Sequence, residues 1–250
     1  MNVVFFGTGE FAVPLLAGLA ASPFPPRLVV TASDRQQGRG RHLAPSPVKA
    51  AARNLGLTVA EMTSRRDPAL LSLLREMAPE MGVLADFSFL LPGILLGLFR
   101  KGIINLHPSL LPCHRGASPI QQAILDGDAR TGNTVMLLSP RLDAGPILAQ
   151  ETRPLAGDET FAGLRDELAA RGLPLVLGVL ARLDPCLAAA REQDVSGLPL
   201  TRKLDKEQGR LDWTKPATRL EREVRAFLPW PGSCTFLLGE KRPIRCFIRQ

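Results

Sequence analysis

The chain has 250 residues, of which 45% are hydrophobic and 22% are charged. These values are ordinary for a globular protein, so they exclude a long disordered chain and allow one large core or one domain with a small second one. The formal net charge of +7 permits an anionic partner such as a nucleic acid, although charge alone identifies none.

The cysteines and the start of the chain predict a reducing compartment. No CxxC pair and no metal-like His/Cys spacing occurs among Cys113, Cys186, Cys234 and Cys246, so we expect free thiols and no metal. Met1 leads directly into an apolar run without a basic leader, and no run of 18 apolar residues follows. We therefore expect a cytoplasmic protein without a membrane segment.

The first 34 residues read as a strand, a glycine turn, a helix and a second strand. Residues 2–6 and 28–31 are short apolar runs, and residues 11–20 have helical character. The turn GTGEFA between them fits the dinucleotide pattern G-x-G-x-x-G/A, with Asp34 at about the right distance. A nicotinamide-binding fold is thus one interpretation, although so short a motif is frequent in strand-helix-strand units.

A basic segment follows, rich in glycine and proline. Over residues 35–49 it carries four positive charges and no acidic residue, on Arg35, Arg39, Arg41 and Lys49. Such a loop can contact phosphates through side chains and backbone N–H groups. The alternative is an ordinary solvated surface loop.

The next elements are predicted from apolar periodicity. We expect a helix over 48–55, a strand over 57–60, a packing helix over 67–77 and a buried strand over 81–87. Asp86 lies near the carboxyl end of that last strand, and residues 88–92 form a loop.

Residues 102–121 contain the most specific pattern. The apolar pair Ile103 and Ile104 begins a strand on which Asn105 and His107, two apart, lie on one face. Pro108 ends the strand, and a new helix is expected near Ser118. Polar side chains at the carboxyl end of a buried strand form a ligand site in open α/β sheets. A histidine that only bonds to backbone is the alternative.

A second strand is expected over residues 134–138, with Asp143 in the loop beyond it. Parallel connectivity would bring Asp143 beside His107. Asparagine, histidine and aspartate would then converge.

The rest of the chain divides into three parts. We expect a strand over 147–151 and helices over 161–171 and 173–183, which complete a domain of residues 1–183. Residues 184–203 hold proline and glycine with little periodicity and are predicted to be a linker. In residues 204–250, a helix over 217–227 precedes two strands, 234–238 and 244–248, joined by a turn.

The pattern NxHPSLLPxxRGASP, followed by LDAG, strongly resembles the folate-dependent formyltransferase family. Four more stretches are similar to the branch that formylates methionyl initiator tRNA: VVFFGTGEFAVPLL, SDRQQGRGRHLAPSPVKAAA, TRKLDKEQGRLDWTKPA and RAFLPWPGS. The resemblance therefore covers the whole chain. That family has a similar glycine turn here without binding nucleotide, which weighs against the nicotinamide interpretation. It usually has proline where this chain has Gly9, and this departure makes the turn look more like a dinucleotide motif than it otherwise would.

The resemblance implies an α/β, Rossmann-like formyltransferase fold with a mostly parallel sheet, plus the start of a small C-terminal β-barrel (OB-like) domain. It implies transfer of the formyl group of 10-formyltetrahydrofolate to the α-amino group of methionyl initiator tRNA, through a tetrahedral oxyanion and without a metal. Asn105 and His107 would stabilise the oxyanion, and Asp143 would orient His107 or relay a proton.

The same resemblance assigns binding residues. The folate would contact eight residues, namely Asp86, Phe87, Ser88, Phe89, Ser109, Leu110, Leu111 and Pro112. The basic loop would enter the tRNA acceptor stem, using Arg35, Arg39, Arg41 and Lys49. We expect a monomer.

Two alternatives stay open. Since the family continues into a complete barrel, residues 204–250 are expected to be an incomplete tRNA-binding domain, and the chain could be a non-catalytic folate- or tRNA-binding remnant. It could also formylate another acceptor, such as an amino-sugar nucleotide or glycinamide ribonucleotide. The basic loop and LDWTKPA argue against another acceptor, and the intact Asn-His-Asp set argues against a remnant.

Overall fold

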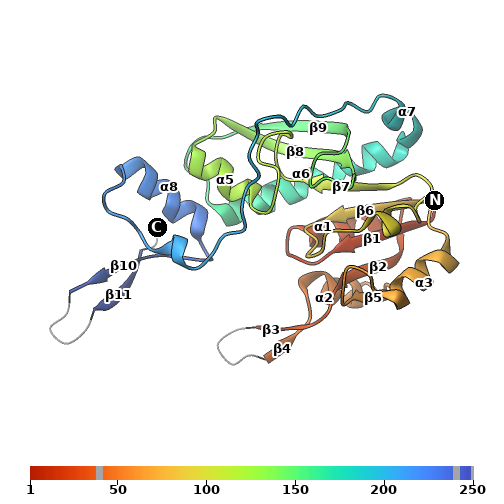
Figure 1. Ribbon diagram of the computed structural model, residues 1–250, viewed down its shortest axis with the longest axis horizontal. Coiled ribbons are helices and arrows are strands. Elements are labelled where there is room, and N and C mark those ends of the chain that lie inside the picture. Colours follow the sequence, from red (N-terminus) through yellow and green to blue (C-terminus); the bar gives the residue numbers. More distant parts are fainter. Residues whose placement is uncertain (38–41, 239–242, 249–250) are drawn as a thin grey trace.

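The protein is described by a computed structural model that covers residues 1–37, 42–238 and 243–248. Its centre is a seven-stranded sheet in the order β5-β2-β1-β6-β7-β8-β9 (Figure 1). The strands are β1 (Val3–Gly7), β2 (Pro26–Ala32), β5 (Val59–Met62), β6 (Met81–Ala85), β7 (Ile103–His107), β8 (Arg130–Leu137) and β9 (Ile147–Pro154). The first five pair in parallel, so the predicted mostly parallel α/β class is confirmed.

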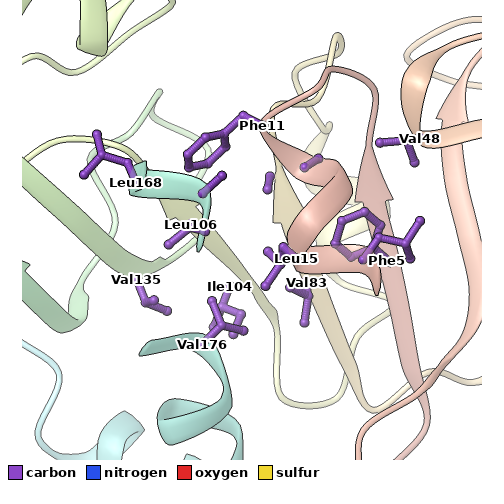
Figure 2. Packing of buried hydrophobic residues seen from close by; sticks show 14 of the residues in the cluster. Phe5, Phe11, Leu15, Val48, Val83, Ile104, Leu106, Val135, Leu168 and Val176 are labelled. Carbon is purple, nitrogen blue, oxygen red and sulfur yellow. The ribbon is translucent and has the colours of Figure 1, made fainter. Parts of the chain in front are cut away.

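The two faces of the sheet are both covered, which explains the continuous apolar runs of its strands. Side chains alternate along β1, so Val3 and Phe5 join one buried cluster while Val4 and Phe6 join the other. Figure 2 shows Phe5, Leu15 and Val176 within the larger cluster.

Helices form the outer layers. The larger cluster is completed by α1 (Ala12–Ala20), α2 (Pro47–Asn54), α5 (Pro119–Asp126) and α6 (Phe161–Ala181), and the smaller one by α3 (Pro68–Met77) and α4 (Gly93–Leu96). α6 is a single helix despite Pro174, so the expected break near residue 172 is wrong. Its buried stripe, which includes Leu168 and Val176, continues past the proline and holds both halves in one line.

The predicted parallel pairing beyond β7 is also wrong. β8 lies antiparallel to β7, with His107 opposite Thr134, and β9 lies antiparallel to β8. An apolar run fixes burial but not strand direction, because both pairings bury the same side chains.

Smaller elements extend from this body. A ribbon of β3 (Arg35–Gln37) and β4 (His42–Ala44) projects after β2, and α7 (Leu183–Ala188) follows α6. After a 3-10 turn at Glu207–Gly209, α8 (Ala217–Phe227) packs beside α5, and the predicted hairpin is present as antiparallel β10 (Ser233–Leu237) and β11 (Ile244–Ile248) (Figure 1). None of the described helices is both long and apolar enough to cross a membrane.

Candidate active site

A cleft of about 540 Å³ opens at the carboxyl ends of β6 and β7. β7 contributes Asn105 and His107, and Asp143 comes from the loop between β8 and β9. The three residues predicted to be catalytic therefore line one cleft, with Asp86, Phe87, Ser88 and Phe89 on its wall.

Asn105 offers an unused amide to this cleft. The residue is only 6% exposed, yet its side chain forms no hydrogen bond with any side chain or backbone group that the structure describes. A nearly buried amide is costly to leave without a partner. Since Asn105 lines the cleft, a ligand is the natural partner for it.

The ring of His107 is oriented by backbone. Its Nε2 lies 3.1 Å from the carbonyl oxygen of His114, and a carbonyl oxygen can only accept a hydrogen bond. Nε2 therefore carries a proton, and Nδ1, on the other side of the ring, is free to act in the cleft.

Asp143 reaches His107 from the loop after β8. Its Oδ2 lies 3.9 Å from His107 Nδ1, too far for a direct hydrogen bond, and the two groups attract each other as opposite charges only when the ring is protonated. The same oxygen accepts a hydrogen bond of 2.9 Å from the backbone N–H of Gly116. The loop folds back over β7, so Asp143 reaches His107 although the strands run antiparallel.

Left-handed backbone is concentrated around the cleft. Among the described residues, four non-glycine residues have φ between 43° and 55°. Three of them belong to this region, namely Asp86, His114 and Asp143. Such strain is held by the surrounding structure and collects at functional sites.

The glycine turn after β1 is occupied by the protein itself. The backbone N–H groups of Thr8 and Gly9 both donate to the carbonyl oxygen of Asp86, and a Cβ on Gly9 would lie 1.9 Å from Asp86 Oδ2. Surrounding protein raises the pKa of the Asp86 carboxyl, although the residue stays accessible from the cleft. A pyrophosphate would meet a carboxylate here and find these two donors used, so the geometry does not support dinucleotide binding.

An aromatic wall closes one side of the cleft. Phe87 packs edge-on to Phe6 and at a tilt to Phe89, with ring centroids 5.7 and 5.8 Å apart. The other half of the predicted folate set is not brought to the cleft: Ser109, Leu110, Leu111 and Pro112 are absent from its lining. Ser109 and Leu111 are buried behind it, bonded to Thr134 on β8.

Several lining residues were not expected from the sequence. They come from the N-cap of α1, the start of α5, the first turns of α6 and the segment before α8, and they include Phe11, Gln121, Phe161, Arg165 and Lys203. The start of α5 belongs to the quoted motif and could have been found. Nothing local in the sequence marks Phe161 or Arg165, because they reach the cleft only through packing of α6 on α1.

The basic segment divides in the structure. The side chain of Lys49 is 4% exposed, and its ammonium group lies 2.6 Å from Asp34 and 2.5 Å from Glu61. Hydrogen bonds to these two carboxylates raise the pKa of Lys49. The positive charge of Lys49 is thus compensated by two carboxylates and its side chain is buried, which does not fit the predicted phosphate contact. The side chain of Arg35, and Arg39 and Arg41 entirely, lie outside the described residues.

No group of three or more His, Cys, Asp or Glu side chains that could hold a metal occurs in the described ranges.

Comparisons with known proteins agree with this architecture. Residues 1–179 match the model of the formyl transferase family and residues 203–248 that of the formyl transferase C-terminal domain. The chain is 45% identical to the methionyl-tRNA formyltransferase of Methylococcus capsulatus, over 96% of this chain and 78% of that protein. It is 42% identical to that of Chloroflexus aggregans, with the same two coverages.

A solved structure shows the same fold at lower identity. The sugar N-formyltransferase from a Shewanella species superposes with a TM-score of 0.73, at 19% identity, over 100% of this chain and 97% of that one.

Proposed function

This chain belongs to the formyl transferase family, in the branch of the methionyl-tRNA formyltransferases, and we propose that it formylates the α-amino group of methionyl initiator tRNA with 10-formyltetrahydrofolate. The observation that carries this proposal is the unused amide of Asn105 in one cleft with His107 and Asp143.

The transfer needs an electrophilic formyl carbon and a path for one proton. The amine nitrogen bonds to that carbon, and the bond from the carbon to N10 of the folate breaks. The amine nitrogen loses one proton in this step, and N10 gains one. Negative charge develops on the formyl oxygen in between. Asn105 Nδ2 is the donor that stabilises this oxyanion, an interaction worth roughly 3 kcal/mol where single donors have been removed.

His107 supplies a second donor when it is protonated. With Nε2–H held by the His114 carbonyl, the neutral ring presents only a lone pair at Nδ1, and the imidazolium presents an N–H there. Asp143 Oδ2 lies 3.9 Å from this Nδ1. Asp143 also lies where it can accept the amine proton through a water molecule.

The cleft fits the proposed co-substrate. A flat heteroaromatic ring suits the wall formed by Phe87 and Phe89, and the polar side chains of Asn105 and His107 on β7 line the same cleft. Asp86 and Ser88 lie beside this wall and would contact the ring system.

We propose that the aminoacyl end of the tRNA enters the cleft beside Lys203. Lys203 lines the cleft and forms no ion pair within the described parts of the chain, whereas Arg165 pairs with Glu10 and Asp166. Lys203 is thus suited to a phosphate near the aminoacyl end. Arg39 and Arg41 would hold the stem, and residues 204–250 would add further contact, with residues 1–183 performing the transfer and 184–203 connecting the two.

The test is formylation of methionyl initiator tRNA by the purified chain, compared with Asn105→Ala and Asp143→Asn. Each substitution should lower kcat at least 100-fold while leaving the melting temperature within a few degrees. Retained turnover in both variants contradicts the catalytic assignment.

If the wild type binds the folate but formylates no tRNA, the proposed acceptor is wrong. Amino-sugar nucleotides and glycinamide ribonucleotide are then the acceptors to offer, and inactivity with all of them would indicate a binding protein.

A further inference from the structure

The segment between α7 and the C-terminal part lies directly on the catalytic unit. We call residues 191–201 the strap; in Figure 1 the chain here runs from α7 back along β9 toward α5. Arg191 exchanges two backbone hydrogen bonds with Ile147, at the start of β9. Arg115 donates to the carbonyl oxygen of Leu198 at 3.0 Å. A segment predicted to be a linker is therefore anchored at several points, although most of its side chains are exposed.

One strap side chain holds the loop that carries Asp143. Gln193 Nε2 donates to the carbonyl oxygens of Asp143 and Gly145, at 3.2 and 2.6 Å. Asp143 itself has φ of 47°, a conformation that its neighbours must maintain. The same Nε2 lies 3.8 Å from Met136 Sδ on β8, and the buried Oε1 of Gln193 has no partner in the described structure.

The far end of the strap holds the donor to the Asp143 carboxylate. Thr201 bonds to the carbonyl oxygen of Arg115 through its N–H and its Oγ, at 2.6 and 3.0 Å, and accepts from Ser118 N–H. Gly116 lies between these anchors, and a Cβ on it would be 2.4 Å from the backbone carbonyl oxygen of Thr201. Gly116 N–H is the group that donates to Asp143 Oδ2.

We propose that Gln193 and Thr201 are positioning residues for formyl transfer, which fix the Asp143 carboxylate beside His107. Gln193 holds the backbone of the Asp143 loop, and Thr201 holds the segment whose Gly116 N–H donates to the carboxylate. This rests on the proposed catalytic role of Asp143. Displacing a catalytic group by about 1 Å can cost 100-fold in rate, so two contacts that set the place of Asp143 control turnover without touching substrate.

The kinetic test uses Gln193→Leu and Thr201→Val, with Glu192→Leu as the matched control on a neighbouring exposed side chain. Gln193→Leu should lower kcat roughly 10- to 100-fold and leave KM for both substrates unchanged. Thr201→Val should lower kcat in the same manner, and Glu192→Leu should change nothing. In an Asp143→Asn background, Gln193→Leu should cost nothing further, since the carboxylate it positions is already absent. Equal losses in both backgrounds would show a general structural role and overturn the proposal.

A spectroscopic arm keeps the test independent of the acceptor. The chain has three histidines, so the ring nitrogens of His107 can be assigned by NMR with a His107→Gln variant. Gln193→Leu should move their chemical shifts toward those of Asp143→Asn, and Glu192→Leu should not. Unchanged His107 shifts in Gln193→Leu overturn the proposal even if activity falls. A wild type inactive on every acceptor is a failure of the proposed function, and these shifts still decide the role of Gln193.

Discussion

At the scale of single residues, the site is set by backbone groups as much as by side chains. The His114 carbonyl determines which nitrogen of His107 carries a proton, and the Gly116 N–H holds the Asp143 carboxylate. His114 adopts φ of 55°, which an ordinary side chain disfavours. Its imidazole contacts Asp128 Oδ2 at 2.6 Å, and this contact anchors the strained residue.

Asp128→Ala should therefore reduce turnover although Asp128 does not line the catalytic cleft. Without its partner His114 can leave the left-handed region, and its carbonyl then no longer fixes the ring of His107. We expect kcat to fall about tenfold, the lower end for a group that orients a functional histidine. Asp126→Ala, two residues earlier at the exposed end of α5, is the control in the same kinetic assay. Equal rates for the two variants would contradict this role of Asp128.

At the scale of elements, the sequence predicted what local patterns determine. The apolar runs placed β1, β6 and β7, and spacing by two placed Asn105 and His107 together on β7. The antiparallel direction of β8 and the approach of Arg165 to the cleft were not predictable, because both depend on contacts between distant segments. The positive charge of Lys49 can be read from the sequence, but its two ion-pair partners cannot, because one follows β2 and the other lies on β5.

Lys49 shows how such a distant contact changes a prediction. Its ammonium group joins Asp34, just after β2, to Glu61 on β5. Lys49→Met should lower the free energy of unfolding by about 2 kcal/mol, since it leaves two carboxylates together without a cation, though both are partly exposed. Urea unfolding measures this loss. Affinity for tRNA should change little in Lys49→Met, whereas Arg41→Ala should weaken binding without changing stability.

The loop between β9 and α6 carries a pH-dependent part of the stability. Although burial favours the neutral form of Glu159, hydrogen bonds from the Ala156 N–H and from Arg153 lower its pKa to about 2. A carboxyl with a depressed folded-state pKa stabilises the fold above its unfolded value of about 4.3, and this stability is lost as pH falls toward 2.

Glu159→Gln should accordingly destabilise the protein by roughly 2 to 3 kcal/mol at neutral pH. The difference from wild type should shrink steadily below about pH 5, because the wild-type carboxyl becomes protonated as well. Urea unfolding at several pH values measures it, with Asp158→Asn as the control, whose carboxyl forms no hydrogen bond with the described residues. A difference that stays constant down to pH 3 would contradict this account.

At the scale of the whole molecule, the two proposed substrates would bind through different forces. The folate would bind in a cleft with an aromatic wall, where burial of apolar surface dominates. The tRNA would be attracted by a chain with 31 Lys and Arg against 24 Asp and Glu, and contacts to phosphate release condensed cations from the nucleic acid.

The two affinities should therefore respond differently to salt. The logarithm of the tRNA binding constant should fall linearly with the logarithm of salt concentration, while folate binding should change little. Arg41→Ala should reduce the steepness of that line by about one unit, the expected effect of one lost phosphate contact. Lys49→Met should leave the slope unchanged, because its charge is already neutralised by Asp34 and Glu61. Filter binding over a salt series measures each slope, and a tRNA affinity independent of salt would contradict recognition through phosphates.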